Sequence, residues 1–381
     1  MTSTLDLDAV LADLGPRCAE AAARHDADDS FVAEAYAALR EARVFSALVP
    51  TDFGGGGCSH AQMCRFLRQL ARHCPSTALA LSMHQHLVAA AAANHRAGRP
   101  GRALLEKVGA NELVLVSTGA NDWLDSNGRA EPVDGGFRVT AVKPFASGSP
   151  SGDVLVTSAA IAGGGEVLHF PVPLGADGVS GLDNWAALGM RGTGSQTLKL
   201  DDVFVPEDAV VLRRPQGLFH PAFAVILTVA MPIILSAYLG VAEEAAGIAI
   251  DCARQTPHDP ANQTLAGELE NRLVAARLAT EDMVRLAEDY DFTPSAELAR
   301  DVLVRKTLAA NAVIAVGEKA MELAGGRAYL RKTGVERLLR DLHGAQFHPL
   351  TEKRQLIFAG RLALGLDPVA GDAGDRTKAA A

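Results

Sequence analysis

The 381-residue sequence has no clustered run of lysine and arginine, and its net charge at pH 7 is −9. A nucleic-acid-binding surface needs such clusters to neutralise phosphates, so the sequence argues against nucleic acid as the main partner. Cysteine is also sparse. The five cysteines, Cys18, Cys58, Cys64, Cys74 and Cys252, have no CxxC spacing. This scatter predicts neither a zinc site nor a disulfide framework.

The N-terminal stretch "MTSTLDLDAVLADLG" lacks the basic start and apolar run of a secretory signal, so we expect a cytoplasmic protein. One segment, 221–242, carries no charge and is long enough to cross a bilayer. The same composition is typical of a helix buried on all sides in a large helical core. Because the sequence has no second segment of this kind, we expect a core helix and no membrane span.

Hydrophobic periodicity divides the chain into three regions. Residues 1–112 and 213–366 have apolar positions at helical spacing, whereas 113–212 contains short alternating runs separated by Gly, Asp and Pro. We expect an α+β, mainly α fold: an N-terminal helical domain, a middle antiparallel β barrel or sandwich, and a C-terminal four-helix bundle. The tail, 367–381, is expected to be disordered.

Two long helices are predicted within the C-terminal region. Gly325 and Gly326 are expected to end the second of them, after "LARDVLVRKTLAANAVIAVGEKAMELA". The first has one apolar stripe at helical spacing. The stripe consists of Leu269, Leu273, Ala276, Thr280, Met283 and Ala287.

Four segments carry more specific motifs. They are "STALALSMHQHLV" (76–88), "KPFASGSPSGDVLVTSA" (143–159), "LGMRGTGSQTLKLDDVFVP" (188–206) and "VERLLRDLHGAQ" (335–346). With the order helices, β domain, helices, they resemble the acyl-CoA dehydrogenase superfamily over about residues 5–366. The third is the most specific, because its Leu-Gly-Met-Arg-Gly-Thr-x-Ser run and the strand that follows match almost letter for letter. The resemblance implies a homotetramer or homodimer that holds a flavin between the β domain and the bundle.

The resemblance also implies roles for particular residues. Phe145 would back the flavin ring, Ser147 would donate a hydrogen bond near N5, and Thr118 would contact the pyrimidine edge. Phe145 and Ser147 are two apart in a predicted strand, so we expect them to face the same side. The loop with Arg191, Thr193 and Ser195 would lie near flavin and substrate. Gly325 and Gly326 would allow the backbone to approach the cofactor pyrophosphate closely, or would serve only as a helix C-cap.

The sequence departs from the family at the catalytic base. The dehydrogenases use the Glu of a Tyr-Glu-Gly-Thr run that follows the Arg-Asp of the last segment. In that register this chain has His348 at the Tyr position and Pro349 at the Glu position, and proline cannot act as a base. Other members place the Glu on the first long bundle helix, where "VILTVAMPIIL" has no carboxylate.

A second branch of the same superfamily fits this histidine better. Two-component flavin monooxygenases take reduced flavin from a reductase and form a C4a-hydroperoxide, and they carry His-Asp-Pro in this segment. The sequence "FHPL" resembles it without the Asp. His348 would act as a base toward the substrate or stabilise the hydroperoxide. If Thr351 caps a following helix, its positive end would lower the pKa of His348. The alternative is a loop histidine that binds backbone.

Three functions follow from these features. The preferred one is a flavin monooxygenase acting on a small molecule with His348 as base, which uses reduced FMN or FAD from a reductase. The second is an FAD-containing acyl-CoA dehydrogenase with a displaced base, acting on an acyl thioester and reducing an electron-transfer flavoprotein. The third is a catalytically degenerate subunit or scaffold. His84, His86 and His343 are expected to be packing or surface groups.

Overall fold

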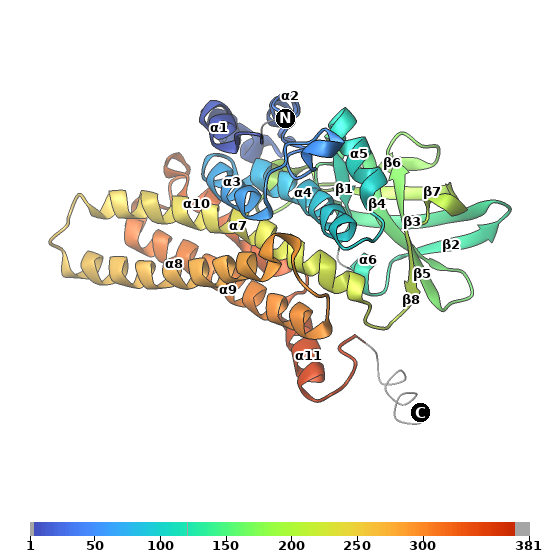
Figure 1. Cartoon of the computed structure of the whole chain (residues 1–381). Coiled ribbons are helices and arrows are strands. Elements are labelled where there is room, and N and C mark those ends of the chain that lie inside the picture. The colour runs from blue at the N-terminus through green and yellow to red at the C-terminus, as the bar shows by residue number, and fades with distance from the viewer. Residues whose placement is uncertain (1–3, 120, 370–381) are drawn as a thin grey trace.

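The structure is a computed structural model that describes residues 4–119 and 121–369. Along the chain, helices form the N-terminal and C-terminal regions, and the strands of a sheet come between them in sequence (Figure 1). The predicted mainly helical α+β fold class is therefore confirmed. The greater part of the tail predicted to be disordered, 370–381, lies outside the described residues.

The N-terminal region consists of helices whose boundaries follow from local sequence. They are α1 (Leu7–Asp28), α2 (Ala33–Glu41), α3 (His60–His73), α4 (Pro75–Arg96) and α5 (Arg102–Asn111). Helix α3 begins with a capping box, in which Ser59 and Gln62 bond each other's backbone N–H groups. The chain breaks at Pro75, because proline fits the first turn of α4 but cannot continue the ladder of α3.

The middle region forms one connected sheet of eight strands. They are β1 (Leu115–Ser117), β2 (Gly128–Val133), β3 (Gly136–Ala146), β4 (Val154–Ile161), β5 (Glu166–Pro173), β6 (Val179–Gly181), β7 (Gln196–Pro206) and β8 (Leu212–Pro215). The order is β6-β7-β3-β2-β4-β5-β8, with β1 beside β4. Strand β4 pairs in parallel with both β1 and β2. The sheet is therefore mixed, and not antiparallel throughout as expected, because β3 and β4 are joined by a crossover and not by a hairpin.

The C-terminal region contains three long helices and two short ones. They are α7 (Pro221–Ala253), α8 (Pro260–Ala287), α9 (Ala296–Ala324), α10 (Val335–Leu342) and α11 (Glu352–Ala363). All six residues of the predicted stripe on α8 are buried. Gly325 ends α9 with a φ of +62°, in the region that glycine favours. These two expectations are confirmed.

Helix α7 is the charge-free segment. Its length and composition alone would allow it to cross a membrane, but 94% of its most apolar window is buried inside the molecule. It runs lengthwise past α3 and α4 on one side and α8 and α9 on the other (Figure 1). At Gly240 an added Cβ would overlap the Arg68 carbonyl oxygen of α3. Helix α7 is therefore placed as a central core helix.

The hydrophobic core has two parts. One cluster combines side chains of α1–α5 with side chains of α7–α11, and a separate cluster lies within the sheet. The helices at the two ends of the chain therefore share one apolar core, although about 100 residues separate them in sequence. The strands lie against one end of this helical body (Figure 1).

Candidate functional site

A large cavity lies where the sheet meets the helical body. Its volume is about 750 Å³, which is within the range of small-molecule and cofactor sites. Side chains of α4 and α7 form one wall, and the loops after β1 and β3 and before β7 form another. Arg340 of α10 and the link 343–351, between α10 and α11, close a third side. Segments from all three regions of the chain therefore meet at this cavity.

Three hydroxyl groups form a connected row on the sheet side of the cavity. The Ser147 and Ser195 Oγ atoms are 2.7 Å apart, and Ser195 Oγ is also 2.7 Å from Thr193 Oγ1. The backbone N–H of Gly148 donates to the Thr193 carbonyl at 2.9 Å, which holds the two loops together. All three hydroxyl residues line the cavity. The structure thus brings together three of the residues predicted for cofactor binding.

Phe145 reaches the cavity for a different reason from the one expected. Simple strand alternation does not place it with Ser147, because β3 has a register irregularity between Lys143 and Ala146 and Phe145 has a φ of +61°. Phe145 is 63% exposed, and its ring meets Trp185 edge-to-face, with centroids 6.3 Å apart. The Trp185 Nε1–H donates to the Arg191 carbonyl at 2.9 Å. The two rings form an aromatic wall at the cavity.

Thr118 lines the cavity just beyond the end of β1. Its hydroxyl donates to the Asp122 carboxylate on the short helix α6 (Asn121–Leu124), and lies 3.3 Å from Thr157 Oγ1. Asp122 in turn bonds the buried ammonium of Lys143 at 2.7 Å. Thr118 is therefore held in place by a buried polar network behind the cavity wall.

His348 lines the cavity on its link side and is bonded to Tyr238 of α7. The His348 Nε2 and Tyr238 hydroxyl are 2.8 Å apart. Burial lowers the pKa of His348 to about 3, with smaller contributions from the nearby charges of Lys306 and His86. Lys306 of α9 donates to the Leu350 carbonyl at 2.9 Å and so anchors the same link.

The expected lowering of the His348 pKa is confirmed, but its cause is different. Thr351 occupies the N-cap position of α11, yet its side chain makes no capping hydrogen bond. Burial of the imidazole is the main cause, so the helix terminus is not needed to explain the shift. His348 is therefore a neutral imidazole at physiological pH.

Other predicted residues lie away from the cavity. The Arg191 guanidinium bonds the Ala187 and Asp26 carbonyls and pairs with Asp29 at 2.9 Å, so its side chain points toward the end of α1. Gly325 and Gly326 follow α9, where the adjoining Arg327 bonds Gln255 just past the end of α7. Within one chain, the structure does not bring these three residues to the cavity.

Sequence reasoning missed several residues at or behind this cavity. Tyr238 and Lys306 were not singled out, and His86 and His343 line the cavity although we expected packing or surface positions. His84 does have a packing role, because both ring nitrogens bond backbone groups of Phe45 and Leu115. Lys306 did leave a signal, since it lies on the buried apolar face of α9 between Leu303 and Ala310.

The charged side chains that line the cavity are all basic among the residues that the structure describes. Among the residues that the structure describes, Lys143, Arg340 and Arg354 contribute to the wall, whereas no Asp or Glu does. The nearby carboxyl of Asp341 is buried behind the wall, where it accepts the backbone N–H of Met190. Burial raises the pKa of Asp341 to about 7. The lining described here therefore offers an imidazole but no carboxylate to a bound substrate.

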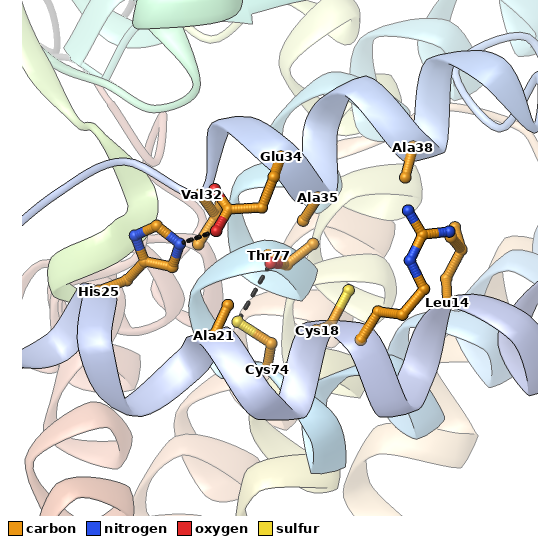
Figure 2. A pocket seen from close by; sticks show the side chains of 11 residues that line it. Leu14, Cys18, Ala21, His25, Val32, Glu34, Ala35, Ala38, Cys74 and Thr77 are labelled. Carbon is orange, nitrogen blue, oxygen red and sulfur yellow. Dashed lines mark hydrogen bonds and ion pairs between the residues drawn. The ribbon is translucent and has the colours of Figure 1, made fainter.

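A second, much smaller cavity lies between α1, α2 and α4 (Figure 2). Its volume of about 50 Å³ has room for a few water molecules and not for an organic ligand. His25 pairs with Glu34 at 2.9 Å at its edge. Burial raises the pKa of the adjacent Cys18 thiol to about 12, so that thiol is not a nucleophile at neutral pH. The large cavity is therefore the candidate active site.

The residues of the large cavity fit a flavin. An isoalloxazine needs an aromatic or apolar wall and hydrogen-bonding groups along its polar edge. Phe145 and Trp185 supply the wall, and the hydroxyls of Ser147 and Ser195 supply the polar groups. A volume of about 750 Å³ leaves space for a second small molecule. The fold and this cavity together define the class: a helical flavoprotein with a central β domain.

The chain belongs to the acyl-CoA dehydrogenase superfamily. The family models "Acyl-CoA dehydrogenase, N-terminal domain" and "Acyl-CoA dehydrogenase, C-terminal domain" match residues 9–100 and 233–353. These two segments cover the N-terminal helices and the greater part of the C-terminal bundle.

Three curated relatives match the chain over nearly their whole length. A putative acyl-CoA dehydrogenase of Bacillus subtilis is 27% identical, and the match covers 87% of this chain and 89% of the relative. An amino sugar nitrososynthase of Streptomyces peucetius is 28% identical, with coverages of 86% and 85%. An isobutylamine N-hydroxylase of Streptomyces viridifaciens is 29% identical, with coverages of 79% and 82%.

A solved structure of similar sequence has the same fold. It is KijD3 in complex with FMN and the nucleotide sugar dTDP-3-amino-2,3,6-trideoxy-4-keto-3-methyl-D-glucose. It is 28% identical to this chain, and the match covers 96% of this chain and 94% of the KijD3 chain. The two structures superpose with a TM-score of 0.86. The comparisons confirm the expected flavin-dependent oxidoreductase and favour its monooxygenase branch over the dehydrogenase and scaffold alternatives.

Proposed function

We propose that this protein is a two-component monooxygenase that takes reduced FMN from a separate reductase and oxygenates a small, largely apolar molecule. The observation that carries this proposal is the cavity lining, in which the described residues place the neutral His348 and no carboxylate. Removal of an acyl α proton would require a base in the lining, and carboxylates are the bases that the dehydrogenases use there. The nitrososynthase and N-hydroxylase relatives support the same reaction class.

The overall reaction balances with O2 as the oxidant. Reduced FMN, when bound, supplies two electrons, so that one oxygen atom enters the substrate and the other leaves as water. Ser147, Ser195 and Thr193 would bind the polar edge of the ring, and Phe145 with Trp185 would cover one of its sides. The apolar wall would exclude bulk water from the reacting groups.

His348 would act as the base that accepts a proton from the substrate. We assign the ring proton to Nε2, donating to the Tyr238 oxygen, because this tautomer leaves Nδ1 with a free lone pair. That lone pair can accept a proton from the substrate heteroatom as oxygen is transferred. Tyr238 fixes the orientation of the ring, and the charge of Lys306 disfavours a protonated imidazole before the substrate binds.

The helical wall indicates the chemical class of the substrate. It is built from apolar side chains of α4 and α7, namely Leu79, Met83, Phe223, Ile226, Leu227, Ala230, Met231 and Ile234. A wall of this kind stabilises an alkyl or aromatic body by burial. We therefore propose an apolar amine, sulfide or aromatic heterocycle in its uncharged form.

We also propose that the protein is a homodimer or homotetramer. Large apolar side chains are exposed on the C-terminal helices or directly after α11, and a partner chain would cover them. They are Leu278, Leu308, Leu356, Ile357 and Leu364. Assembly could also bring Gly325 and Gly326 of one chain near the cavity of another. Light scattering of the purified protein checks the mass, and a monomer at micromolar concentration would contradict this proposal.

The reaction is tested by combining the purified protein with FMN, NADH and a flavin reductase under ¹⁸O2. Apolar amines, sulfides and heterocycles serve as substrates, and mass spectrometry follows the products. We expect one ¹⁸O atom per product molecule and no product when the protein or the reductase is omitted. An acyl-CoA that bleaches a copurified flavin under anaerobic conditions would instead establish the dehydrogenase alternative.

A further inference from the structure

A buried group of charged side chains lies in the cavity wall and directly behind it, on the sheet side. Lys143 of β3 has no solvent-exposed surface, Arg214 of β8 is 2% exposed and Asp122 of α6 is 2% exposed. Thr118 and Asn127, which bond Asp122 and Lys143, both line the cavity. These charges therefore act on a ligand in the cavity through a thin layer of protein.

The hydrogen bonds show that Lys143 is an ammonium ion. Its Nζ donates to Asp122 Oδ1 at 2.7 Å, to the Ser158 carbonyl at 2.7 Å and to Asn127 Oδ1 at 3.0 Å. Only a protonated amine has three N–H donors for three acceptors. The side chain is fixed on three sides, so its charge has a defined place relative to the cavity.

Arg214 adds a second buried cation. Its guanidinium donates to the carbonyls of Asp122 and Leu124, both at 2.9 Å, and to His169 Nε2 at 2.9 Å. A guanidinium keeps its charge in proteins. The bond to His169 requires an unprotonated Nε2, which agrees with a His169 pKa lowered to about 3, mainly by burial and then by Arg214.

The buried charges do not cancel. Lys143 and Arg214 contribute +2 and Asp122 contributes −1, which gives +1 for the group. Asp125 also interacts with Arg214, but it is solvent-exposed and bonded to Gln216, so its charge is strongly screened. In the described part of the chain, the other contacts of this group that the structure defines are to neutral carbonyl, amide, hydroxyl and imidazole groups.

We propose that this buried net charge of +1, centred on Lys143, makes the cavity select reduced FMN over oxidised FMN. This inference rests on the proposed reduced-FMN function. The ring of reduced flavin is anionic when its N1 is deprotonated, whereas the ring of oxidised flavin is neutral. A fixed positive charge that is buried and therefore weakly screened by water stabilises the anionic ring, and it leaves the neutral ring almost unaffected. In this role Lys143 is a positioning and selectivity residue.

The test is the ratio of the dissociation constants of oxidised and reduced FMN. Both are measured at pH 7.5 by titrating the purified full-length protein, with reduced FMN kept anaerobic. Lys143→Met lowers the group charge to zero, and we expect the ratio to fall at least about ten-fold, which is the effect of one unit of charge about 12 Å away at an effective dielectric constant of about 20. Asp122→Asn raises the group charge above +1, and the ratio is expected to rise, by less than the change in Lys143→Met because the loss of Asp122 also lowers the pKa of Lys143.

Two further variants separate charge from structure. The double variant Lys143→Met with Asp122→Asn keeps the group charge at +1 through Arg214, so its ratio is expected to stay within about three-fold of the wild type. Lys199→Met on β7 removes an exposed lysine that pairs with Asp201 and serves as the matched control. If Lys143→Met does not fold, Asp122→Asn and the double variant still decide the question.

The outcomes distinguish the two proposals. Opposite shifts in the two single variants support charge selection, because a purely structural role would weaken both redox states together and leave the ratio unchanged. A ratio that does not move, or that moves in the same direction in both variants, overturns the inference while the reduced-FMN function stands. A wild-type protein that does not prefer reduced FMN contradicts the proposed function itself.

Discussion

His348 owes its neutral state to its surroundings and not to its position before a helix. Burial is the largest cause of its lowered pKa, followed by the charge of Lys306 and the nearby His86. With a pKa of about 3, His348 stays unprotonated throughout the range from pH 5 to 8. A pH–rate profile in that range should therefore show no inflection that belongs to this residue.

Replacing Tyr238 by phenylalanine tests the hydrogen bond that orients His348. The ring loses its 2.8 Å partner while the apolar body of the side chain remains. We expect product formation to fall about ten-fold and more of the consumed NADH to appear as hydrogen peroxide, because oxygen transfer needs a positioned base. The dissociation constant for reduced FMN should change less than about two-fold.

The control for this variant is Tyr329→Phe. Tyr329 is 84% exposed and lies beyond α9, so its hydroxyl is not expected to affect turnover. Equal effects of the two substitutions on product formation would contradict the assigned role of Tyr238. Unchanged coupling of NADH to product in Tyr238→Phe would do the same.

Among the elements, α7 has the most demanding packing. It forms part of the cavity wall and also packs against α3. Gly240 lies at the closest approach, since a Cβ there would overlap the Arg68 carbonyl oxygen and meet Ala71 Cβ at 3.0 Å. Glycine is required at this position by the neighbouring backbone and not by its own dihedral angles.

Two glycine-to-alanine substitutions on α7 should have opposite effects on stability. Gly240→Ala forces α3 and α7 apart and is expected to lower the free energy of unfolding by about 2–4 kcal/mol. Gly247→Ala, seven residues further along, has nothing within 4 Å of its new Cβ. It should raise the free energy by about 0.5–1 kcal/mol through helix propensity. Urea unfolding of both variants measures the difference, and equal values would refute the close packing.

The end of β3 shows where element-level patterns fail. The period-two pattern correctly predicts a strand through this segment, but its alternation does not extend through Phe145, where the backbone takes a positive φ. An irregularity of this kind depends on how β3 pairs with β7, which the local sequence does not specify. The motif resemblance nevertheless selected Phe145 and Ser147, and both line the cavity.

For the whole molecule, the sequence predicts the order of regions well because the period of apolar residues changes with the type of element. The predicted α8 stripe and the end of α9 are confirmed on this basis. The site was predicted less completely. Tyr238 of α7 lies 110 residues from His348, and Lys306 lies on α9. Only the shared helical core brings the three residues together. Periodicity carries no information about such contacts.

Acidification should weaken the whole fold through its buried histidines. Burial lowers the pKa values of His84 and His86 to about 4 and those of His169 and His348 to about 3. In the unfolded chain the pKa of a histidine is about 6.5. Below pH 6.5 the unfolded chain therefore binds more protons than the folded protein, and the free energy of unfolding falls as the pH is lowered. Asp341, with a pKa raised to about 7, binds protons in the folded state and offsets part of this loss.

The size of the effect follows from the same linkage. Between pH 6.5 and 5.5 each of the four histidines removes about 1 kcal/mol and Asp341 restores about 1 kcal/mol. We therefore expect the free energy of unfolding to fall by about 3 kcal/mol in that interval, as measured by urea titration at each pH. His86→Leu should reduce the fall by about 1 kcal/mol, because the buried ring that must stay neutral is gone. The matched control is His258→Gln, because His258 lies on the surface. An equal fall in the wild type and in both variants would exclude the buried ring of His86 as a source of the acid sensitivity.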